Sequence, residues 1–227
     1  MEQYGRTLPD LDRPLLSVRP ETSENYLSGE SFKQILAGFA EKDIIFDRIF
    51  FRDPFTSQDS ADVLAYALNE GKAGFSADFR VIISQRIPSH GQRISDLVRN
   101  QVLSGKLDDL PQKFEYILKK MELAENEFFS DSENPLFNWN ADSIAGSFKK
   151  YGFEVKSASK VVTEKRRISE GEISKWFDSE NSSYGKVLSS AVGNEDLEKI
   201  KNLLVTAAQK TLFNWNTEIE FITVSAK

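Results

Sequence analysis

The chain has 227 residues, a formal net charge of −6 at pH 7, a single histidine and no cysteine. Its 40% hydrophobic and 28% charged residues are the ordinary mix of a globular protein, and its length suits one large domain better than two small ones. The lack of cysteine excludes disulfides, thiolate zinc sites and cysteine nucleophiles. A lone histidine excludes the usual multi-histidine metal sites, so we expect no metal site.

The N-terminus and the hydropathy pattern predict a cytoplasmic protein without a membrane partner. No apolar run approaches the roughly 18 residues that a bilayer span requires. Residues 1–6 (MEQYGR) lack the basic start and apolar stretch of a signal peptide. The acidic net charge also means that binding of nucleic acid would need a local basic patch. The pattern leaves the oligomeric state open.

Residues 1–40 are expected to form a leading segment ahead of a main domain that covers residues 41–227. Residues 15–18 (LLSV) predict a short strand, closed by Pro20. Apolar residues at helical spacing predict a helix over residues 31–41.

The main domain begins with a predicted strand, helix and strand joined by short links. Residues 44–51 (IIFDRIFF) have the β-branched and aromatic composition of a strand buried in a parallel sheet. Residues 60–70 form an amphipathic helix that ends at Gly71, and residues 79–85 (FRVIISQ) predict a second buried strand. This order indicates a right-handed crossover in a parallel sheet.

The second half is predicted to combine helices with two further strands. Helical patterns cover most of residues 92–130, with breaks near Gly105 and Pro111, and then residues 142–151, 168–177 and 197–210. Residues 153–162 alternate as in an exposed strand, and residues 219–224 predict a last strand. The pentapeptide LFNWN occurs at 136–140 and at 212–216, but its flanks match at no fixed period, so we predict no internal repeat.

The turn Tyr151-Gly152-Phe153 ends a predicted helix and begins a strand. It resembles the turn before the sixth strand of class I methyltransferases, whose last strand inserts antiparallel beside that strand. Residues 218–226 would fill the role of the last strand. The resemblance implies an α/β, Rossmann-like fold with a mostly parallel sheet and an antiparallel last strand, of which this chain would be the C-terminal half.

Residues 46–55 (FDRIFFRDPF) are similar to the fourth strand of that family and the acidic-proline turn after it. Amino-methylating enzymes carry two prolines in this turn, and this chain carries only Pro54. The difference argues against methylation of a base.

Two other segments resemble a narrower group. Residues 85–95 (QRIPSHGQRIS) and residues 167–177 are similar to the methyltransferase-like region fused C-terminally to replication-associated recombination AAA+ ATPases of the RarA type. The resemblance covers roughly residues 40–227. It implies that the AAA+ ATPase portion of the same protein is a partner, in DNA replication or repair.

The cofactor loop of the methyltransferase family is missing from this sequence. Class I enzymes hold S-adenosylmethionine on a glycine-rich loop after their first strand, where the backbone must approach the cofactor closely. The glycines of the first 40 residues are Gly5, Gly29 and Gly38, and no two of them form a Gly-x-Gly pattern. Either the chain is a piece of a longer protein or the domain no longer binds S-adenosylmethionine.

Candidate ligand-binding residues follow the two predicted buried strands, at the carboxyl ends where open α/β sheets bind ligands. Asp53, Pro54 and Phe55 would contact a substrate or cofactor after the first strand; the alternative is that Asp53 caps the next helix. The second strand is followed by Arg86, His90, Gln92 and Arg93.

These residues suit anion binding better than catalysis. Arg86 and Arg93 could hold a phosphate, and His90 could act as a general base near neutral pH. Asp53 and His90 are the catalytic candidates, but no carboxylate or nucleophile near His90 in the sequence completes a catalytic set.

Lys165, Arg166 and Arg167 form, with Lys160, the dense basic cluster of the chain. They are candidates for contact with a nucleic-acid backbone. The alternative is a solvated helix or strand face, which the neighbouring Glu164 favours.

Three functions remain open from the sequence. The first is a methyltransferase-like domain without an intact cofactor loop, acting as an accessory or interaction module of a AAA+ ATPase. The second is an active S-adenosylmethionine-dependent methyltransferase that is part of a longer chain. The third is a nucleic-acid-binding module that uses Arg86, Arg93 and residues 165–167.

Overall fold

The computed structural model describes residues 34, 37–38, 41, 45–104 and 112–226. The strand expected at 15–18 and the expected boundary after residue 40 lie outside the described residues, as does most of the helix expected at 31–41. The elements in chain order are β1 (Phe46–Arg52), α3 (Gln58–Glu70), η1 (Lys72–Gly74), β2 (Phe75–Arg86), η2 (Pro88–His90), α4 (Ile94–Leu97), η3 (Val98–Val102), α5 (Gln112–Phe129), α6 (Ala141–Lys149), β3 (Glu154–Arg166), α7 (Glu170–Trp176), α8 (Ser183–Val192), α9 (Asn194–Ala208) and β4 (Phe213–Ser225).

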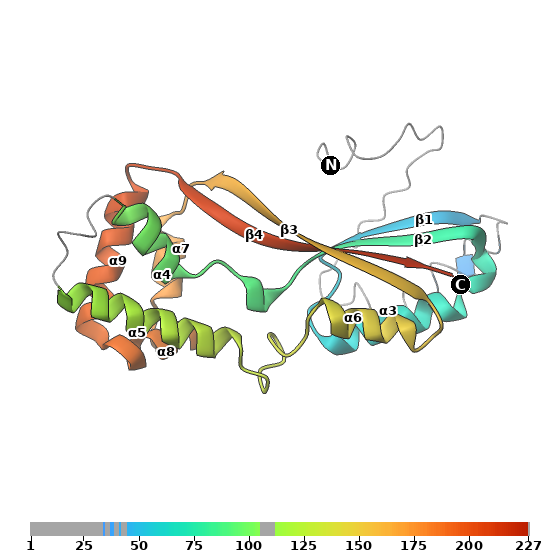
Figure 1. Ribbon diagram of the computed structural model, residues 1–227, viewed down its shortest axis with the longest axis horizontal. Helices are drawn as coiled ribbons and strands as arrows, with labels where there is room; N and C mark the ends of the chain where they lie inside the picture. The colour runs from blue at the N-terminus through green and yellow to red at the C-terminus, as the bar shows by residue number, and fades with distance from the viewer. Residues whose placement is uncertain (1–33, 35–36, 39–40, 42–44, 105–111, 227) are drawn as a thin grey trace.

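The four described strands form one mixed sheet in the order β1-β2-β4-β3 (Figure 1). β1 and β2 pair in parallel, whereas β4 runs antiparallel to both β2 and β3. The antiparallel last strand is therefore confirmed. β1, β2 and β3 run in the same direction, as expected of a mostly parallel sheet. The expectation is wrong for the pairings, however, because β4 lies between β2 and β3 and makes two of the three pairings antiparallel.

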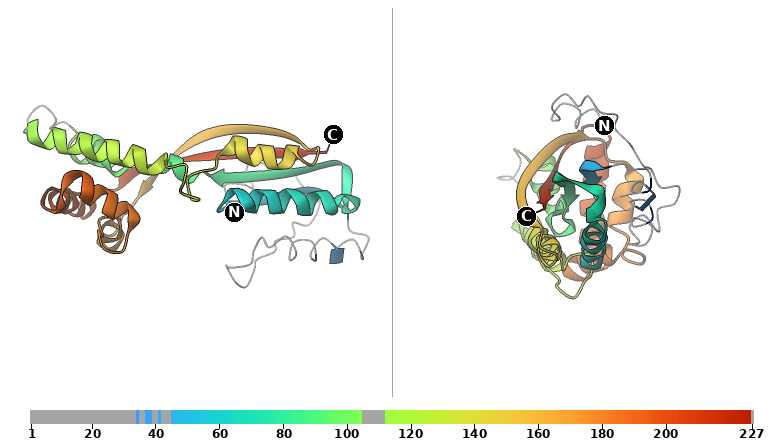
Figure 2. Two further views of the ribbon diagram at one scale, coloured as in Figure 1. Left: turned by 90° about the horizontal axis from the view of Figure 1, so that it is seen from below. Right: turned by 90° about the vertical axis from the view of Figure 1, so that its right-hand side faces the viewer.

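Helices α3 and α6 lie side by side on one face of this sheet (Figure 2). Side chains such as Val81, Ile83 and Ile222 point from the strands into a core that they share with Leu64 and Phe148 of the helices. Sequence signals set where both helices begin. Ser57 and Asn140 each accept a hydrogen bond from the backbone three residues on, in a reciprocal capping box.

The β3–β4 pair continues beyond the sheet as a two-stranded ribbon. β4 pairs with β3 along Phe213–Ser225 but with β2 only from Ile219 onward. The remaining part of the ribbon reaches the helical end of the molecule (Figure 1). There Phe213 is fully buried among α4, α5, α7, α8 and α9, in a second core that includes Leu97, Met121 and Leu204.

The structure extends several predicted elements and adds one helix. β3 and β4 are longer than the strands predicted at 153–162 and 219–224, and α8 was not predicted. Gly193, at φ +82°, separates α8 from α9 with a backbone conformation that favours glycine. Within the described ranges, no helix combines the length and the apolar character needed to cross a bilayer.

Candidate functional site

The carboxyl ends of β1 and β2 meet, as the sequence predicted, and Asp53 and Arg86 bind each other there. The Asp53 carboxylate accepts hydrogen bonds from the Arg86 backbone N–H and from its Nε, both at 2.9 Å. Arg86 Nη2 lies 2.9 Å from the same carboxylate. Asp53 also has a left-handed backbone at φ 47°. The pair holds the two strand ends together, so much of the charge of each residue is already matched by the other.

Pro54 and Phe55 belong to the core of the sheet. Phe55 is 3% exposed and packs against Phe148 of α6. Its backbone is held on both sides by Gln85, whose Oε1 accepts from Phe55 N at 3.0 Å and whose Nε2 donates to Phe55 O at 3.2 Å. The Asp53–Phe55 turn therefore fixes the end of β1 against β2.

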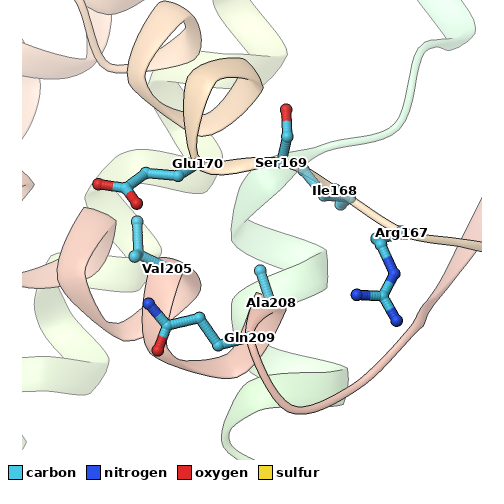
Figure 3. Close-up of a pocket in the computed structure, with 7 residues that line it drawn as sticks. All are labelled: Arg167, Ile168, Ser169, Glu170, Val205, Ala208 and Gln209. Atoms are coloured by element: carbon cyan, nitrogen blue, oxygen red, sulfur yellow. The ribbon is translucent and has the colours of Figure 1, made fainter.

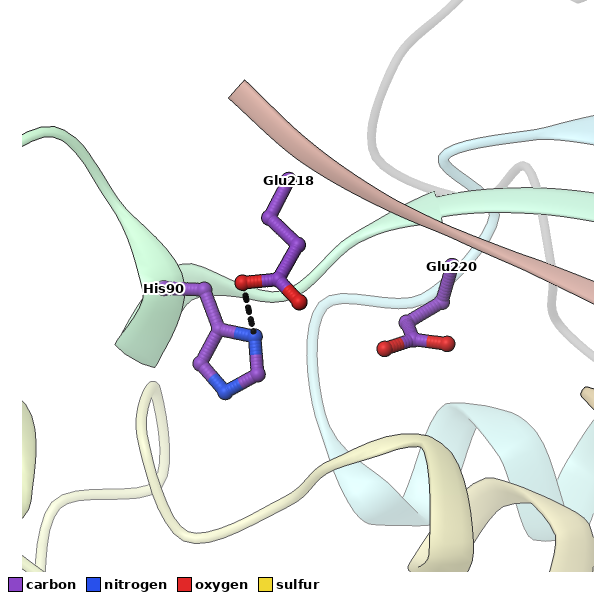
Figure 4. Close-up of side chains that lie close together, drawn as sticks. All are labelled: His90, Glu218 and Glu220. Carbon is purple, nitrogen blue, oxygen red and sulfur yellow. Dashed lines mark ion pairs between the residues drawn. The ribbon is translucent and has the colours of Figure 1, made fainter. Parts of the chain in front are cut away.

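His90 lies at the junction between the sheet and the helical end, beside two glutamates of β4. Its Nδ1 is 3.1 Å from Oε2 of Glu218 (Figure 4). Glu220 points from the same face of β4, because alternate residues of a strand share a face. One nitrogen of His90 and one oxygen each of Glu218 and Glu220 lie within 4.8 Å of one another. An imidazole and two carboxylates therefore lie together near the carboxyl ends of the parallel strands.

The two other candidates after β2, Gln92 and Arg93, make internal contacts. Gln92 Oε1 accepts from the backbone N–H of Asn216 at 3.0 Å. Arg93 donates to the carbonyls of Gly91 and Ser89 at 2.7 and 2.9 Å, and its guanidinium stacks 3.8 Å from the centre of the Phe129 ring. Burial lowers the pKa of Arg93 from its usual range. Both side chains order the loop that carries His90, and neither points to an anion site.

The basic cluster lies where β3 leaves the ribbon and enters the helical end. Arg166 is engaged by Glu172 at 2.6 Å and lies over the ring of Trp215, whereas Lys165 and Arg167 are exposed. Arg167 borders a pocket of about 390 Å³ between the start of α7 and the end of α9 (Figure 3). Glu170 faces the same pocket, so the lining of the pocket is not uniformly basic. The pocket is separate from the His90 group.

A larger basic surface covers the sheet face opposite α3 and α6. Cross-strand pairing places Arg48 beside Arg80 and Phe50 beside Ile82, and it places Lys156 in line with Ile82 through Thr223. Phe50 and Phe221 remain 37% and 36% exposed on this face. We call this surface the basic face; it comprises Arg48, Phe50, Arg52, Arg80, Ile82, Lys156, Lys160, Ile219 and Phe221, with Glu154 at the start of β3 on the same face.

Sequence reasoning missed the two glutamates and the basic face for the same reason. Glu218 and Glu220 lie in the last strand, far from His90 along the chain, and only the insertion of β4 beside β2 brings them together. The cations of the basic face come from three strands, so no dense run of basic residues marks them. The available signal was the alternation of Glu218 and Glu220 with the apolar residues Ile219 and Phe221 in the last strand.

Comparison with known proteins adds no relative: the chain matches neither any protein-family profile nor any curated protein.

Proposed function

We propose that the chain is a methyltransferase-like α/β module without the cofactor loop of that family, and that it serves as an accessory or interaction module of a AAA+ ATPase acting in DNA replication or repair. The family part of the proposal rests on the sheet. The AAA+ part rests on the resemblance of residues 85–95 and 167–177.

The strand order β1-β2-β4-β3 is the observation that supports the methyltransferase-like assignment most. The resemblance requires the last strand to insert antiparallel beside the strand that follows the Tyr151–Phe153 turn. β4 takes that position between β2 and β3. Gly152, at φ +80°, supplies the left-handed turn that leads α6 into β3. Parallel β1 and β2, linked through α3, supply the crossover expected of a Rossmann-like half.

The helical end favours an interaction role over a catalytic one. It is built from α4 and α5, which follow β2, and from α7 to α9, which lie between β3 and β4. These helices share a core of their own, so they add a separate packed body to the sheet. The Asp53–Arg86 pair also occupies the strand ends at which a substrate would be bound.

Isothermal titration of the purified chain with S-adenosylmethionine and S-adenosylhomocysteine tests the missing cofactor site. We expect no binding by a well-folded sample. Micromolar affinity for either compound would contradict the proposal and favour an active methyltransferase. The reading frame upstream is a second test: we expect it to encode a AAA+ ATPase, and a glycine-rich cofactor loop there would contradict the assignment.

The basic face supports a second candidate function, binding of single-stranded nucleic acid. Cations on a sheet can contact the phosphates, and exposed aromatic rings can stack on bases. Arg48, Arg80 and Lys156 are exposed on this face around Phe50. The face is basic although the chain carries a net charge of −6. In the cluster of residues 165–167, Arg166 is paired with Glu172, which leaves Lys165 and Arg167 as its exposed cations.

Fluorescence anisotropy with labelled single-stranded DNA at several salt concentrations tests this candidate. Arg48→Ala combined with Arg80→Ala is expected to lower the slope of log K against log salt concentration by about 1.4, since two phosphate contacts are lost and each contributes about 0.7 on a single strand. Lys119→Ala combined with Lys120→Ala, two exposed lysines of α5, is the matched control and should leave binding unchanged. Equal loss in both double variants would reduce the binding to a general charge effect and contradict a specific face.

A further inference from the structure

The ligand atoms of His90, Glu218 and Glu220 converge at the junction between the sheet and the helical end. We propose that these three side chains bind one divalent transition-metal ion. The proposal is independent of whether the chain is methyltransferase-like.

The distance between the first two ligands suits a shared ion. Nδ1 of His90 and Oε2 of Glu218 are 3.1 Å apart. If each atom were ~2.1 Å from the same ion, this separation would correspond to an angle of about 95° at the metal, which is close to the angle between neighbouring ligands of an octahedral site. The ligand atoms of all three residues lie within 4.8 Å of one another, so binding of one shared ion requires at most a small movement of the Glu220 side chain, which lies beside Glu218 in Figure 4.

Glu220 supplies an independent reason to expect a cation. The residue is only 8% exposed, and within the described part of the chain no side chain donates to its carboxylate, whose oxygens keep only slight contact with solvent. The nearby side chains of Gln85 and Ser159 donate their hydrogen bonds to groups other than the Glu220 carboxylate. The amide of Gln85 donates to the carbonyls of Phe55 and Arg86, and the hydroxyl of Ser159 donates to Glu218. Buried carboxylates are normally paired or coordinated to a metal, because an unpaired buried charge is strongly unfavourable.

A plain ion pair accounts for only part of this group. The contact between His90 and Glu218 would be an ordinary salt bridge on a partly exposed surface. It gives no reason for a second carboxylate to be buried beside it without a partner. A cation shared by all three ligands accounts for both carboxylates.

The surrounding residues hold the ligands in place, as outer-shell groups of metal sites do. Ser159 donates a hydrogen bond of 2.5 Å to Oε1 of Glu218, which leaves Oε2 directed at His90. The η2 turn that carries His90 is fastened by Arg93, whose guanidinium binds the carbonyls of Ser89 and Gly91. The histidine and the two glutamates are thus presented from ordered segments.

One imidazole and two carboxylates favour Zn²⁺, Mn²⁺ or Fe²⁺ over Mg²⁺ and Ca²⁺, which prefer oxygen ligands alone. Three protein ligands leave at least one coordination position for water or a small ligand. The side chains of His90 and Glu218 are 41% and 32% exposed, so that position is accessible to solvent. The ion would also connect the loop after β2 to the ribbon that joins the two ends of the molecule.

Binding of Zn²⁺ and Mn²⁺ to the full chain, stripped with a chelator, tests the proposal by isothermal titration. We expect one ion per chain and much weaker binding of Mg²⁺. Glu220→Gln and His90→Gln should each weaken Zn²⁺ binding by at least about tenfold. Glu164→Gln, which changes an exposed carboxylate on the same ribbon, is the matched control and should bind like the unaltered chain. Failure of the folded chain to bind either ion, or equal binding by all variants, would overturn the proposal.

Thermal unfolding separates metal binding from a folding defect. In the presence of a chelator, Glu220→Gln is expected to melt at the same temperature as the unaltered chain or higher, because an unpaired buried charge is removed. Zn²⁺ should then raise the melting temperature of the unaltered chain and leave that of Glu220→Gln unchanged. An equal rise in both proteins would place the bound ion elsewhere and contradict the assignment.

Discussion

At the scale of single residues, the buried carboxylate of Glu125 organises the helical end. It accepts a hydrogen bond from the backbone N–H of Ile94 at 2.7 Å and further ones from the backbone and hydroxyl of Ser95 and from the hydroxyl of Tyr184. One side chain of α5 therefore holds the start of α4 and the first turn of α8. Burial raises the pKa of Glu125 above its ordinary value of 4.5, although these hydrogen bonds oppose the rise.

The raised pKa predicts that Glu125 makes stability depend on pH. The folded state prefers the protonated carboxyl, so the contribution of this group is complete below pH 4.5 and is lost as pH rises through the folded-state pKa. Relative to Glu125→Gln, which cannot ionise, the free energy of unfolding of the unaltered chain should fall as pH increases from 4.5. Urea unfolding at several pH values measures this difference, and parallel pH curves for the two proteins would contradict it.

Removing the acceptor altogether should be more damaging. Glu125→Ala leaves several buried donors without a partner, so we expect a loss of about 2–4 kcal/mol in the free energy of unfolding at neutral pH. Urea unfolding at pH 7 measures it. A loss below about 1 kcal/mol would mean that water replaces the carboxylate at this position.

Gly185 is required by close backbone contact in α8. A Cβ atom at this position would lie 2.3 Å from the carbonyl oxygen of Asp178, which is backbone and cannot move aside easily. Gly185→Ala is therefore expected to destabilise the chain by about 1–3 kcal/mol. Gly146→Ala in α6 is the matched control, since a Cβ there meets nothing within 4 Å and alanine should stabilise the helix by about 0.5–1 kcal/mol. Thermal unfolding compares the two, and similar effects would contradict the steric explanation.

At the scale of elements, two glutamine side chains form hydrogen bonds with the backbone of β4 along the part of its edge that does not pair with β2. Among the described residues, no strand pairs with the edge of residues 213–218 of β4 that continues the side on which β2 lies. Gln101 accepts from the backbone N–H of Asn214 at 2.6 Å and donates to its carbonyl at 2.8 Å, and Gln92 accepts from the N–H of Asn216. These amides satisfy the backbone groups that an open strand edge would otherwise expose.

Loss of one of these amides should loosen the ribbon locally. Gln101→Ala is expected to lower the free energy of unfolding by about 1–2 kcal/mol, because two hydrogen bonds to the backbone are lost. Hydrogen exchange of the Asn214 amide should accelerate, whereas Gln209→Ala, at the end of α9, should leave it unchanged. Unaltered exchange at Asn214 in Gln101→Ala would show that the ribbon does not depend on this contact.

At the scale of the whole molecule, the protein has two hydrophobic cores, one at the sheet and one at the helical end. Leu68 lies in the core of the sheet and Leu204 in the core of the helical end, and both are fully buried. Three described links join the cores (Figure 1). They are the β3–β4 ribbon, the segment 87–93 between β2 and α4, and the segment 130–140 between α5 and α6.

This division predicts that each end can open separately. Leu68→Ala and Leu204→Ala should each cost about 2–5 kcal/mol within their own core. Hydrogen exchange measured by mass spectrometry should rise in α3, α6, β1 and β2 for the first variant and in α5, α8 and α9 for the second. A uniform rise across the chain in both variants would indicate one cooperative unit.

Local patterns in the sequence were sufficient for the centre of most elements. The apolar runs of β1 and β2 and the amphipathic face of α3 were predicted, because burial on the sheet imposes composition and periodicity on short segments. The antiparallel direction of the last strand was expected from the resemblance to class I methyltransferases, and β4 has that direction. Prediction failed where a segment is exposed on both faces, as in the ribbon half of β3, and for α8, whose helical pattern was not recognised.

The repeated pentapeptide shows how weak local information becomes without tertiary contacts. Residues 136–140 form turns that lead to the cap of α6, and Trp139 is buried beneath the sheet. The same five residues at 212–216 enter β4, where the ring of Trp215 lies tilted against Trp176 and beneath the guanidinium of Arg166. Identical residues adopt different structures because different neighbours pair with their backbone.

The sequence by itself determined the α/β class and the strand ends at which Asp53, Arg86 and His90 lie. Tertiary structure alone decided that Asp53 and Arg86 bind each other and that Glu218 and Glu220 reach His90. The physical reason is the range of the interactions involved. Hydrophobic periodicity and helix caps act within a few residues, whereas the register of β4 against β2 and β3 joins distant parts of the chain and selects which polar groups meet.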